Sequence, residues 1–164
     1  MGIDPGSRFT GFAIIDSDGQ LSRHVHSGCI KLGSAPFPER LGQIYTDLAQ
    51  LIAQYSPTQM AIENVFVAKN PSSALKLGQA RGAAICAGVV QGLSVAEYAP
   101  REVKQAIVGK GSADKAQVQH MTRILLNIQK KLQEDQSDAL GIALCHAHRA
   151  AFNKKIKLAE QRLK

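Results

Sequence analysis

Residues 2–30, with the sequence GIDPGSRFTGFAIIDSDGQLSRHVHSGCI, predict the first layer of the fold. Residues 1–4 resemble the end of a strand that enters the turn at 5–7, and residues 12–16 form a second apolar strand. Asp18-Gly19 is a hairpin turn signal, and the stretch 21–30 that follows it is a third strand. Three strands joined by tight turns predict an antiparallel meander.

Beyond residue 30 the pattern alternates between helix and strand. Helical apolar spacing predicts a helix at 38–55, and 60–63 is a short buried strand that ends in an acid. Further helices are expected at 72–91, 101–108, 113–127 (with Ser112 as its N-cap) and 137–149, and a strand at 95–98. This order predicts an α/β fold, a mixed five-stranded sheet flanked by helices on both faces. The helix at 72–91 is rich in Ala and Gly and is expected to be central to packing.

The chain has 164 residues, which fits one domain. We expect one folded domain at 1–149 and a basic tail at 150–164 that is either a frayed helix or disordered. The length excludes enzymes whose site lies between two catalytic lobes. The net charge is +7, and the excess lies mainly in residues 69–131 and in the tail. Charge alone leaves two interpretations open, a polyanion-binding protein or simply a basic soluble one.

The cysteines and the apolar stretches favour a cytoplasmic protein. Cys29, Cys86 and Cys145 are far apart and form no C-x-x-C, so a disulfide scaffold or a cysteine zinc site is not expected. No signal peptide is visible, and the longest small-apolar stretch is about half of what a membrane-spanning helix needs.

Four acids occupy positions that solvated acids seldom take. Asp4 and Glu63 end apolar strands, and Asp135 and Asp138 lie one helical turn apart at the start of the last predicted helix. Taken singly, each has an ordinary explanation as a turn, strand-end or helix-start residue. Together, in a basic chain, they predict a divalent metal site, because four adjacent carboxylates need a cation to stay ionised. Two Mg²⁺ ions about 4 Å apart can activate a water and stabilise the leaving oxygen in phosphodiester cleavage.

Five stretches resemble, in order, the motifs of the bacterial RuvC Holliday-junction resolvases. They are GIDPGS at 2–7 with Thr10-Gly11, AIENVF at 61–66, AKNPSSALKLGQARG at 68–82, VKQAIVGKGSADKAQVQ at 103–119 and DQSDALGIALCHAH at 135–148. The first motif is weak by itself, because other ribonuclease H-like proteins and actin-like ATPases share its shape. The five together are specific, and they cover the chain to about residue 148.

The resemblance implies a ribonuclease H-like fold, a homodimer, and Mg²⁺-dependent resolution of four-way DNA junctions by paired symmetric nicks in recombination and repair. It makes Asp4, Glu63, Asp135 and Asp138 the catalytic acids that bind the metal, two Mg²⁺ ions per site with Mn²⁺ as a substitute. It also implies the RuvA and RuvB branch-migration proteins as partners. No membrane partner is expected.

Two alternatives compete with this interpretation. A non-catalytic junction-binding protein with a degenerate site is disfavoured because all four acids are present. An actin-like ATPase is disfavoured because the chain is too short for a second lobe and contains no G-x-x-x-x-G-K-[ST] loop.

Basic residues in the middle of the chain are expected to bind DNA phosphates, each releasing counterions. They are Lys69, Lys76, Arg81, Arg101, Lys104, Lys110 and Lys115. Lys104, Lys110 and Lys115 are the strongest candidates because they flank the break at 109–111 and the helix start after it. Phe66 has two interpretations, a core side chain or an aromatic that stacks on an unpaired base. The family resemblance favours the DNA role.

Several features depart from the family pattern or carry weak signals. Met1 directly precedes Gly2, where several apolar residues are usual, and Asn64 replaces an expected Gln. His24 and His26 are expected to share a strand face, which is more often a surface pair than a metal site. His146 could line the acidic site, but it cannot chelate together with His148, since the two point to nearly opposite sides of a helix.

Overall fold

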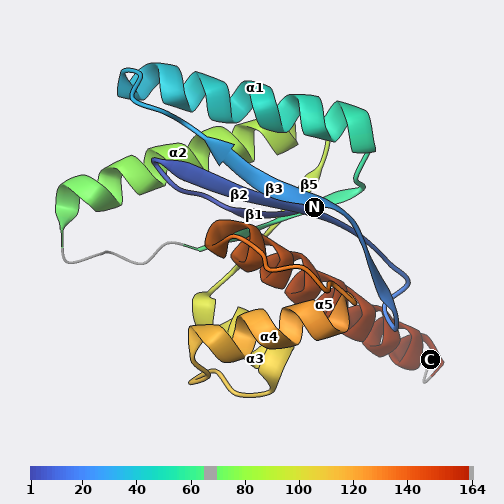
Figure 1. Ribbon diagram of the computed structural model, residues 1–164. Helices are drawn as coiled ribbons and strands as arrows, with labels where there is room; N and C mark the ends of the chain where they lie inside the picture. The colour runs from blue at the N-terminus through green and yellow to red at the C-terminus, as the bar shows by residue number, and fades with distance from the viewer. Residues whose placement is uncertain (65–69, 163–164) are drawn as a thin grey trace.

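The computed structural model describes residues 1–64 and 70–162 (Figure 1). The strands are β1 (Gly2–Asp4), β2 (Phe9–Ser17), β3 (Ser22–Lys31), β4 (Gln59–Glu63) and β5 (Ser94–Tyr98). The helices are α1 (Phe37–Tyr55), α2 (Pro71–Val90), α3 (Pro100–Val108), α4 (Lys115–Leu125) and α5 (Glu134–Arg162). Every expected element is present, and most boundaries differ from the prediction by one to three residues.

The five strands form one mixed sheet in the order β3-β2-β1-β4-β5. The pairs β2–β3 and β1–β2 are antiparallel, and Gly19 in the hairpin turn has a φ of 90°. The pairs β1–β4 and β4–β5 are parallel. Because β1, β4 and β5 run in one direction, their carboxyl ends meet at one end of the sheet.

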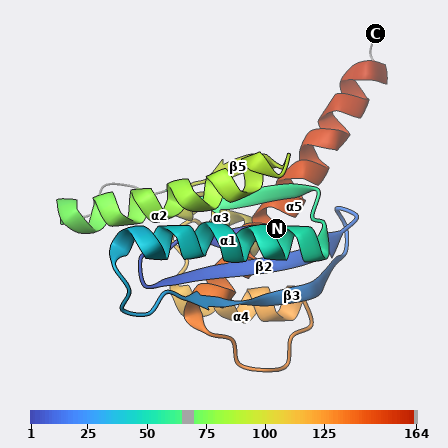
Figure 2. The same ribbon diagram turned by 90° about the horizontal axis from the view of Figure 1, so that it is seen from above.

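Helices cover both faces of the sheet, as expected. Figures 1 and 2 show α1 and α2 side by side on one face, while α5 lies on the other between the sheet and the pair α3 and α4. Each face has its own apolar core. Ile44 and Leu48 of α1 are fully buried on one side, and Leu140 of α5 is fully buried on the other.

The central helix is α5, not the Ala- and Gly-rich α2 that the sequence favoured. Only one stripe of α2, which includes Ala80 and Ala84, is buried, while Leu75 on its opposite side is 70% exposed. In α5 every residue from Ala139 to Cys145 is buried, because this helix is covered by the sheet on one side and by α3 and α4 on the other. The small residues of α2 therefore allow it to pack closely on α1, but α2 stays at the outside of the fold.

The starts of the last two helices correct the prediction. The N-cap of α4 is Asp114, not Ser112: its carboxylate accepts a hydrogen bond from the Gln117 amide, 2.8 Å away. The last helix, α5, begins at Glu134, three residues before the predicted start. It then continues through residue 162, so its backbone has no break between the expected nuclease domain and the expected basic tail.

A β-bulge separates the two histidines of β3. Ile14 pairs with His26 and Ile15 with His24, so β3 carries one extra residue at this point. His26 stacks on Tyr55 of α1, with ring centroids 5.1 Å apart, whereas His24 bonds to Ser27 on the side of the sheet that α5 covers. The expectation that His24 and His26 share a face is therefore wrong.

The start of α5 lies directly on β2 at a glycine. A Cβ atom placed on Gly11 would stand 2.0 Å from the main-chain oxygen of Asp135. Only a residue without a side chain allows this approach, which brings the first turn of α5 onto the sheet.

We expect Gly11→Ala to lower the free energy of unfolding by about 3 kcal/mol, the upper end for overpacking of a core. Urea denaturation measures this loss. The matched control is Gly42→Ala in α1, where no atom lies within 4 Å of the added methyl. That change should stabilise the protein by roughly 0.5–1 kcal/mol through the higher helix propensity of alanine. Equal stability of Gly11→Ala and the native chain would contradict the close approach.

Candidate active site

Two of the four acids lie at the carboxyl ends of neighbouring parallel strands. Asp4 is the last residue of β1 and Glu63 the last residue of β4, and the residues before them, Ile3 and Ile62, are register partners. Both strands are anchored by buried apolar side chains, which carry the two acids to the same end of the sheet.

The other two acids come to the same place through α5. Asp4 pairs with Gly11 across β1 and β2, and the backbone of Asp135 lies over Gly11. Asp138 follows one turn later in the helix. The close contact at Gly11 is therefore what joins the acids of the sheet to the acids of the helix.

The four acids influence one another electrostatically. Burial, together with the charges of Asp138, Glu63 and Asp135, raises the pKa of Asp4 to about 8. Burial and the charge of Asp138 also raise the pKa of Glu63. For Asp138 burial again raises the pKa, and the ammonium of Lys115 opposes it. The acids thus share one region of low dielectric, where their negative charges repel.

Lys115 is the cation that this cluster already holds. Its Nζ lies 2.7 Å from Oδ2 of Asp138 and also forms an ion pair with Glu134. These bonds raise its pKa although partial burial lowers it. Among the described residues, no three His, Cys, Asp or Glu side chains are close enough to form a metal-binding group. The acids are therefore close enough to interact through their charges but do not share a metal position as they stand, and Asp138 is turned towards Lys115.

A thiol lies at the edge of the cluster. Sγ of Cys29 is 3.9 Å from Oδ2 of Asp135, a weak hydrogen bond from β3 to α5. Burial and the neighbouring acids raise the pKa of this thiol to about 11, so it is a neutral thiol at pH 7. A neutral thiol is a poor nucleophile and a poor metal ligand.

The predicted phosphate-binding residues have different surroundings. Lys104 is partly buried and close enough to Glu63 to lower the pKa of that carboxyl, whereas Lys110 is exposed. Lys76 is exposed on α2, with its Nζ 6.0 Å from the Phe37 ring centroid. Arg101 on α3 is exposed, and its side chain lies against Gly111, where an added Cβ would stand 2.5 Å from Cγ of Arg101.

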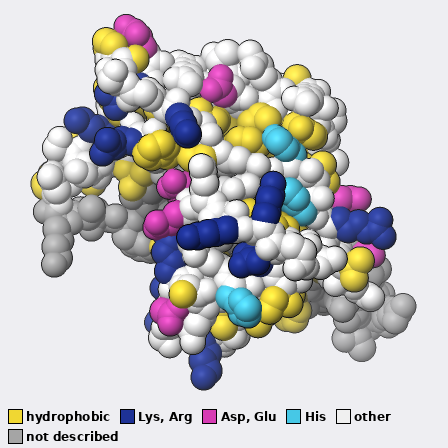
Figure 3. Space-filling view, viewed as in Figure 1, with side chains coloured by type: hydrophobic (Ala, Val, Ile, Leu, Met, Phe, Trp, Pro, Cys, Tyr) yellow, Lys and Arg dark blue, Asp and Glu magenta, His cyan; other side chains and the backbone are white. Residues whose placement is uncertain are grey.

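Three further candidates differ from this group. Arg81 of α2 is mostly buried, and its guanidinium bonds to the main-chain oxygen of Glu63 and to the Glu97 carboxylate. Phe66 and Lys69 lie outside the described residues. Figure 3 shows acidic side chains at several places on one face of the molecule, and those near the centre of the view have Lys and Arg side chains close by.

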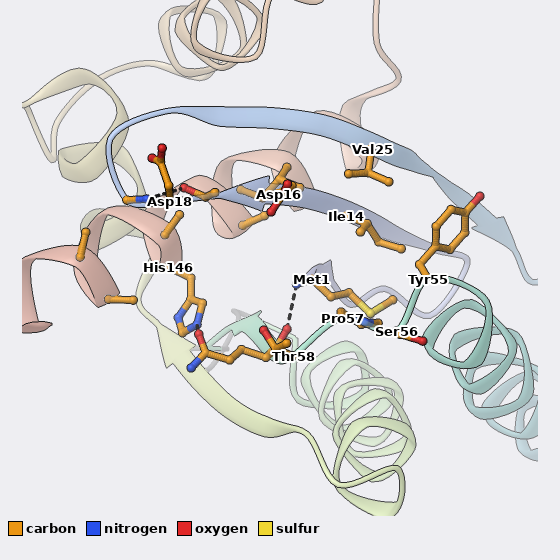
Figure 4. A pocket seen from close by; sticks show the side chains of 18 residues that line it. Met1, Ile14, Asp16, Asp18, Val25, Tyr55, Ser56, Pro57, Thr58 and His146 are labelled. Carbon is orange, nitrogen blue, oxygen red and sulfur yellow. Dashed lines mark hydrogen bonds between the residues drawn. The ribbon is translucent and has the colours of Figure 1, made fainter.

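His146 does not line the acidic site. It lies at the other end of the sheet, where Nδ1 bonds to the Tyr98 hydroxyl (2.8 Å) and Nε2 to Oε1 of Gln59 (2.9 Å). Figure 4 shows it in a cavity of about 570 Å³ that Met1 and Tyr55 also line. None of the four acids lines this cavity. As expected, His148 points elsewhere, towards the oxygen of Ala106.

Sequence patterns named Lys115 and Arg81 only as phosphate-binding candidates and did not predict the contacts that arrange the site. The ion pairs of Lys115, the contact of Arg81 with Glu63 and the thiol of Cys29 join segments far apart in the chain. For Gly11 a signal existed, because a glycine inside an apolar strand often marks a close backbone approach.

The mixed sheet, the helices on both faces and the acids at one end define a ribonuclease H-like α/β domain. The family model described as crossover junction endodeoxyribonuclease RuvC matches residues 1–146. The chain belongs to this family.

Relatives and solved structures agree with that assignment. The chain is 54% identical over 159 residues to the crossover junction endodeoxyribonuclease RuvC of Alkalilimnicola ehrlichii, covering 97% of this chain and 96% of that one. Identity to the protein of the same name from Dichelobacter nodosus is 58% over 148 residues, with 90% and 84% covered. Thermus thermophilus RuvC in complex with a Holliday junction superposes with a TM-score of 0.88 at 33% identity, covering 93% of this chain and 94% of that one.

In the described residues, no helix is long and apolar enough to cross a membrane.

Proposed function

We propose that this chain is a metal-dependent endodeoxyribonuclease that resolves four-way DNA junctions by paired symmetric nicks, in recombination and repair. The observation that carries the proposal is the meeting of Asp4, Glu63, Asp135 and Asp138 at one end of the sheet, where burial and mutual repulsion raise the pKa of Asp4 to about 8. Family membership supports it, since the relatives are named crossover junction endodeoxyribonucleases and one was solved with a Holliday junction.

The acidic residues suit Mg²⁺ as the metal. Carboxylate oxygens are its preferred ligands, and a cluster that suppresses its own ionisation is relieved by a divalent cation. We propose two ions per site, held by Asp4, Glu63, Asp135 and Asp138, with Mn²⁺ able to substitute. When bound, the metal would activate a water for attack on phosphorus and balance the charge of the leaving oxygen.

The side chains of this chain prepare the site for that reaction. The strand ends hold Asp4 and Glu63 side by side, and the contact at Gly11 holds the start of α5 against them. Burial raises the pKa of Asp138, and the ammonium of Lys115 opposes that rise by stabilising the carboxylate. A metal that takes Oδ2 of Asp138 would displace Lys115, whose ammonium keeps its pair with Glu134 and would add positive charge near a phosphate.

The DNA contacts are also part of the proposal. Phosphate-binding charge comes from Lys69, Lys76, Arg101, Lys104 and Lys110, and Phe66 meets a base near the crossover. Arg81 is a candidate for a different role, because its guanidinium bonds to the main chain of Glu63 and to the Glu97 carboxylate.

We propose a homodimer as the working unit, because two symmetric nicks require two active sites related by a two-fold axis. Mass measurement in solution tests the subunit count. RuvA and RuvB are the proposed protein partners, and the cytoplasm is the proposed location. The three cysteines, all free, are consistent with a reducing compartment.

A nicking assay on a synthetic four-way junction, with and without Mg²⁺, tests the activity. We expect paired nicks only with the metal, and much slower cleavage of a linear duplex of the same sequence. The rival is a junction-binding protein without catalysis. Binding of the junction with no nicks in either Mg²⁺ or Mn²⁺ would favour that rival.

We expect Lys104→Gln to weaken junction binding and to lower the slope of log K against log salt concentration by about 0.9, the value for one lost phosphate contact. Binding in EDTA-containing buffer over a series of salt concentrations measures this slope. The matched control is Arg23→Gln, which removes one exposed cation at the far end of β3. An unchanged slope for Lys104→Gln would remove this residue from the interface.

A further inference from the structure

Arg81 reaches the backbone of a proposed catalytic acid from a neighbouring layer. It lies on α2 with its side chain only 17% exposed. Its Nε donates a hydrogen bond to the main-chain oxygen of Glu63, 3.0 Å away. The other arm of the guanidinium pairs with the Glu97 carboxylate on β5. One side chain thus connects α2 with the ends of two strands.

Among the residues that the structure describes, the neighbouring strand β1 offers this oxygen no donor. The Ala61 amide donates to the Met1 oxygen across the parallel pair β1–β4. In a parallel ladder the bonds alternate at two-residue steps, so the amide of residue 5 would be next to face the oxygen of Glu63. Residue 5 is a proline and has no N–H. Arg81 supplies the donor that β1 lacks at the position where Glu63 must be held.

The contact acts on position and not on the charge of the acid. The cations that lower the pKa of Glu63 are Lys115 and Lys104, whereas Arg81 bonds to the main chain and has Glu97 as its counter-ion. A guanidinium suits this task because its planar fork donates in two fixed directions at once, which an ammonium does not.

We infer that Arg81 is a positioning residue: it fixes the end of β4 so that the Glu63 carboxylate is aligned for the metal. This inference rests on the proposed function, in which Glu63 is a metal ligand. Phosphate binding, the role that the sequence suggested for Arg81, is the competing role.

The variants Arg81→Gln and Arg81→Lys test the inference, with Glu97→Gln and Arg23→Gln as controls. Three quantities are measured: the nicking rate, the affinity of the DNA-free protein for Mn²⁺ by electron paramagnetic resonance, and junction affinity in EDTA over a salt series. For Arg81→Gln we expect a 10- to 100-fold loss of Mn²⁺ affinity, as for other outer-shell partners of metal ligands. The nicking rate should fall by a similar factor, since small misplacements of catalytic groups have that effect.

Junction affinity in EDTA should stay within about twofold, with an unchanged salt slope. Arg81→Lys should lose most of the metal affinity although it keeps the charge, and Glu97→Gln, which leaves the Nε bond intact, should lose little. Arg23→Gln should match the native protein in nicking rate, Mn²⁺ affinity and junction affinity.

The opposite pattern overturns the inference. If Arg81 binds phosphate, Arg81→Gln weakens the junction complex, lowers the salt slope by about 1 and leaves Mn²⁺ affinity unchanged, while Arg81→Lys is close to native. Thermal unfolding shows whether each variant is folded. If Arg81→Gln does not fold, the results for Arg81→Lys decide between the two roles of Arg81. The variant Glu63→Gln distinguishes a failure of the proposed function from a failure of the inference about Arg81. If it nicks normally, the proposed function fails; if it is inactive while Arg81→Gln is normal, only the inference about Arg81 fails.

Discussion

Asp4→Asn should abolish junction nicking while the junction still binds. We expect the rate in Mg²⁺ to fall by roughly 10³-fold or more, because a metal ligand supports several kcal/mol of transition-state stabilisation. Asp4 is the acid with the clearest interactions with the other three, so its loss should disturb the whole cluster.

Binding should respond differently. Without metal Asp4 is largely protonated near neutral pH, because its pKa is about 8, so the neutral amide changes the local charge little and junction affinity in EDTA should stay within about threefold of native. Gel-shift and single-turnover nicking assays on the same junction separate the two effects. The matched control is Asp16→Asn, the same chemical change at an exposed position of β2, which should be silent. A loss of binding as large as the loss of cutting would count against a catalytic role for Asp4.

The second large effect is a stability that depends on pH and metal together. The pKa of Asp4 is raised from its ordinary 3.8 to about 8 in the folded protein. The folded state therefore binds this proton more tightly than the unfolded chain. The contribution to stability is fully present below about pH 4 and is lost as pH rises towards about 8. Glu63 and Asp138 act in the same direction, because their pKa values are also raised.

Divalent metal should reverse this loss. At about 100 times its dissociation constant, Mg²⁺ adds about 2.7 kcal/mol, which for a domain of this size raises Tm by roughly 5–10 °C. The shift should be large near pH 8 and small near pH 5, where protonated acids compete with the metal. Thermal unfolding at matched ionic strength measures it, with Asp4→Asn as the variant that should lose the Asp4 share of the pH slope and most of the metal effect. Equal Mg²⁺ shifts at both pH values would argue against these carboxylates as the ligands.

Local patterns predicted the elements of this fold well. The hairpin turn at Asp18-Gly19, the helical spacing of α1 and the short buried strand before Glu63 all depend on residues close in the chain, and all three are present. Predictions failed where two local signals compete and where the pairing of two neighbouring strands shifts by one residue. The N-cap of α4 is Asp114 and not the predicted Ser112. One extra residue in β3 places His24 and His26 on opposite faces of the sheet.

The sequence by itself determined the identities of the four acids and their places at the ends of strands and at the start of a helix, since apolar periodicity and motif order are local properties. Only the tertiary structure decided how Asp135 reaches Asp4, which depends on a backbone contact over Gly11. It also decided that Lys115 pairs with Asp138 and that Arg81 holds the end of β4. The physical reason is the same in each case: these contacts join residues that are far apart in the chain and come close only when both layers pack on the sheet.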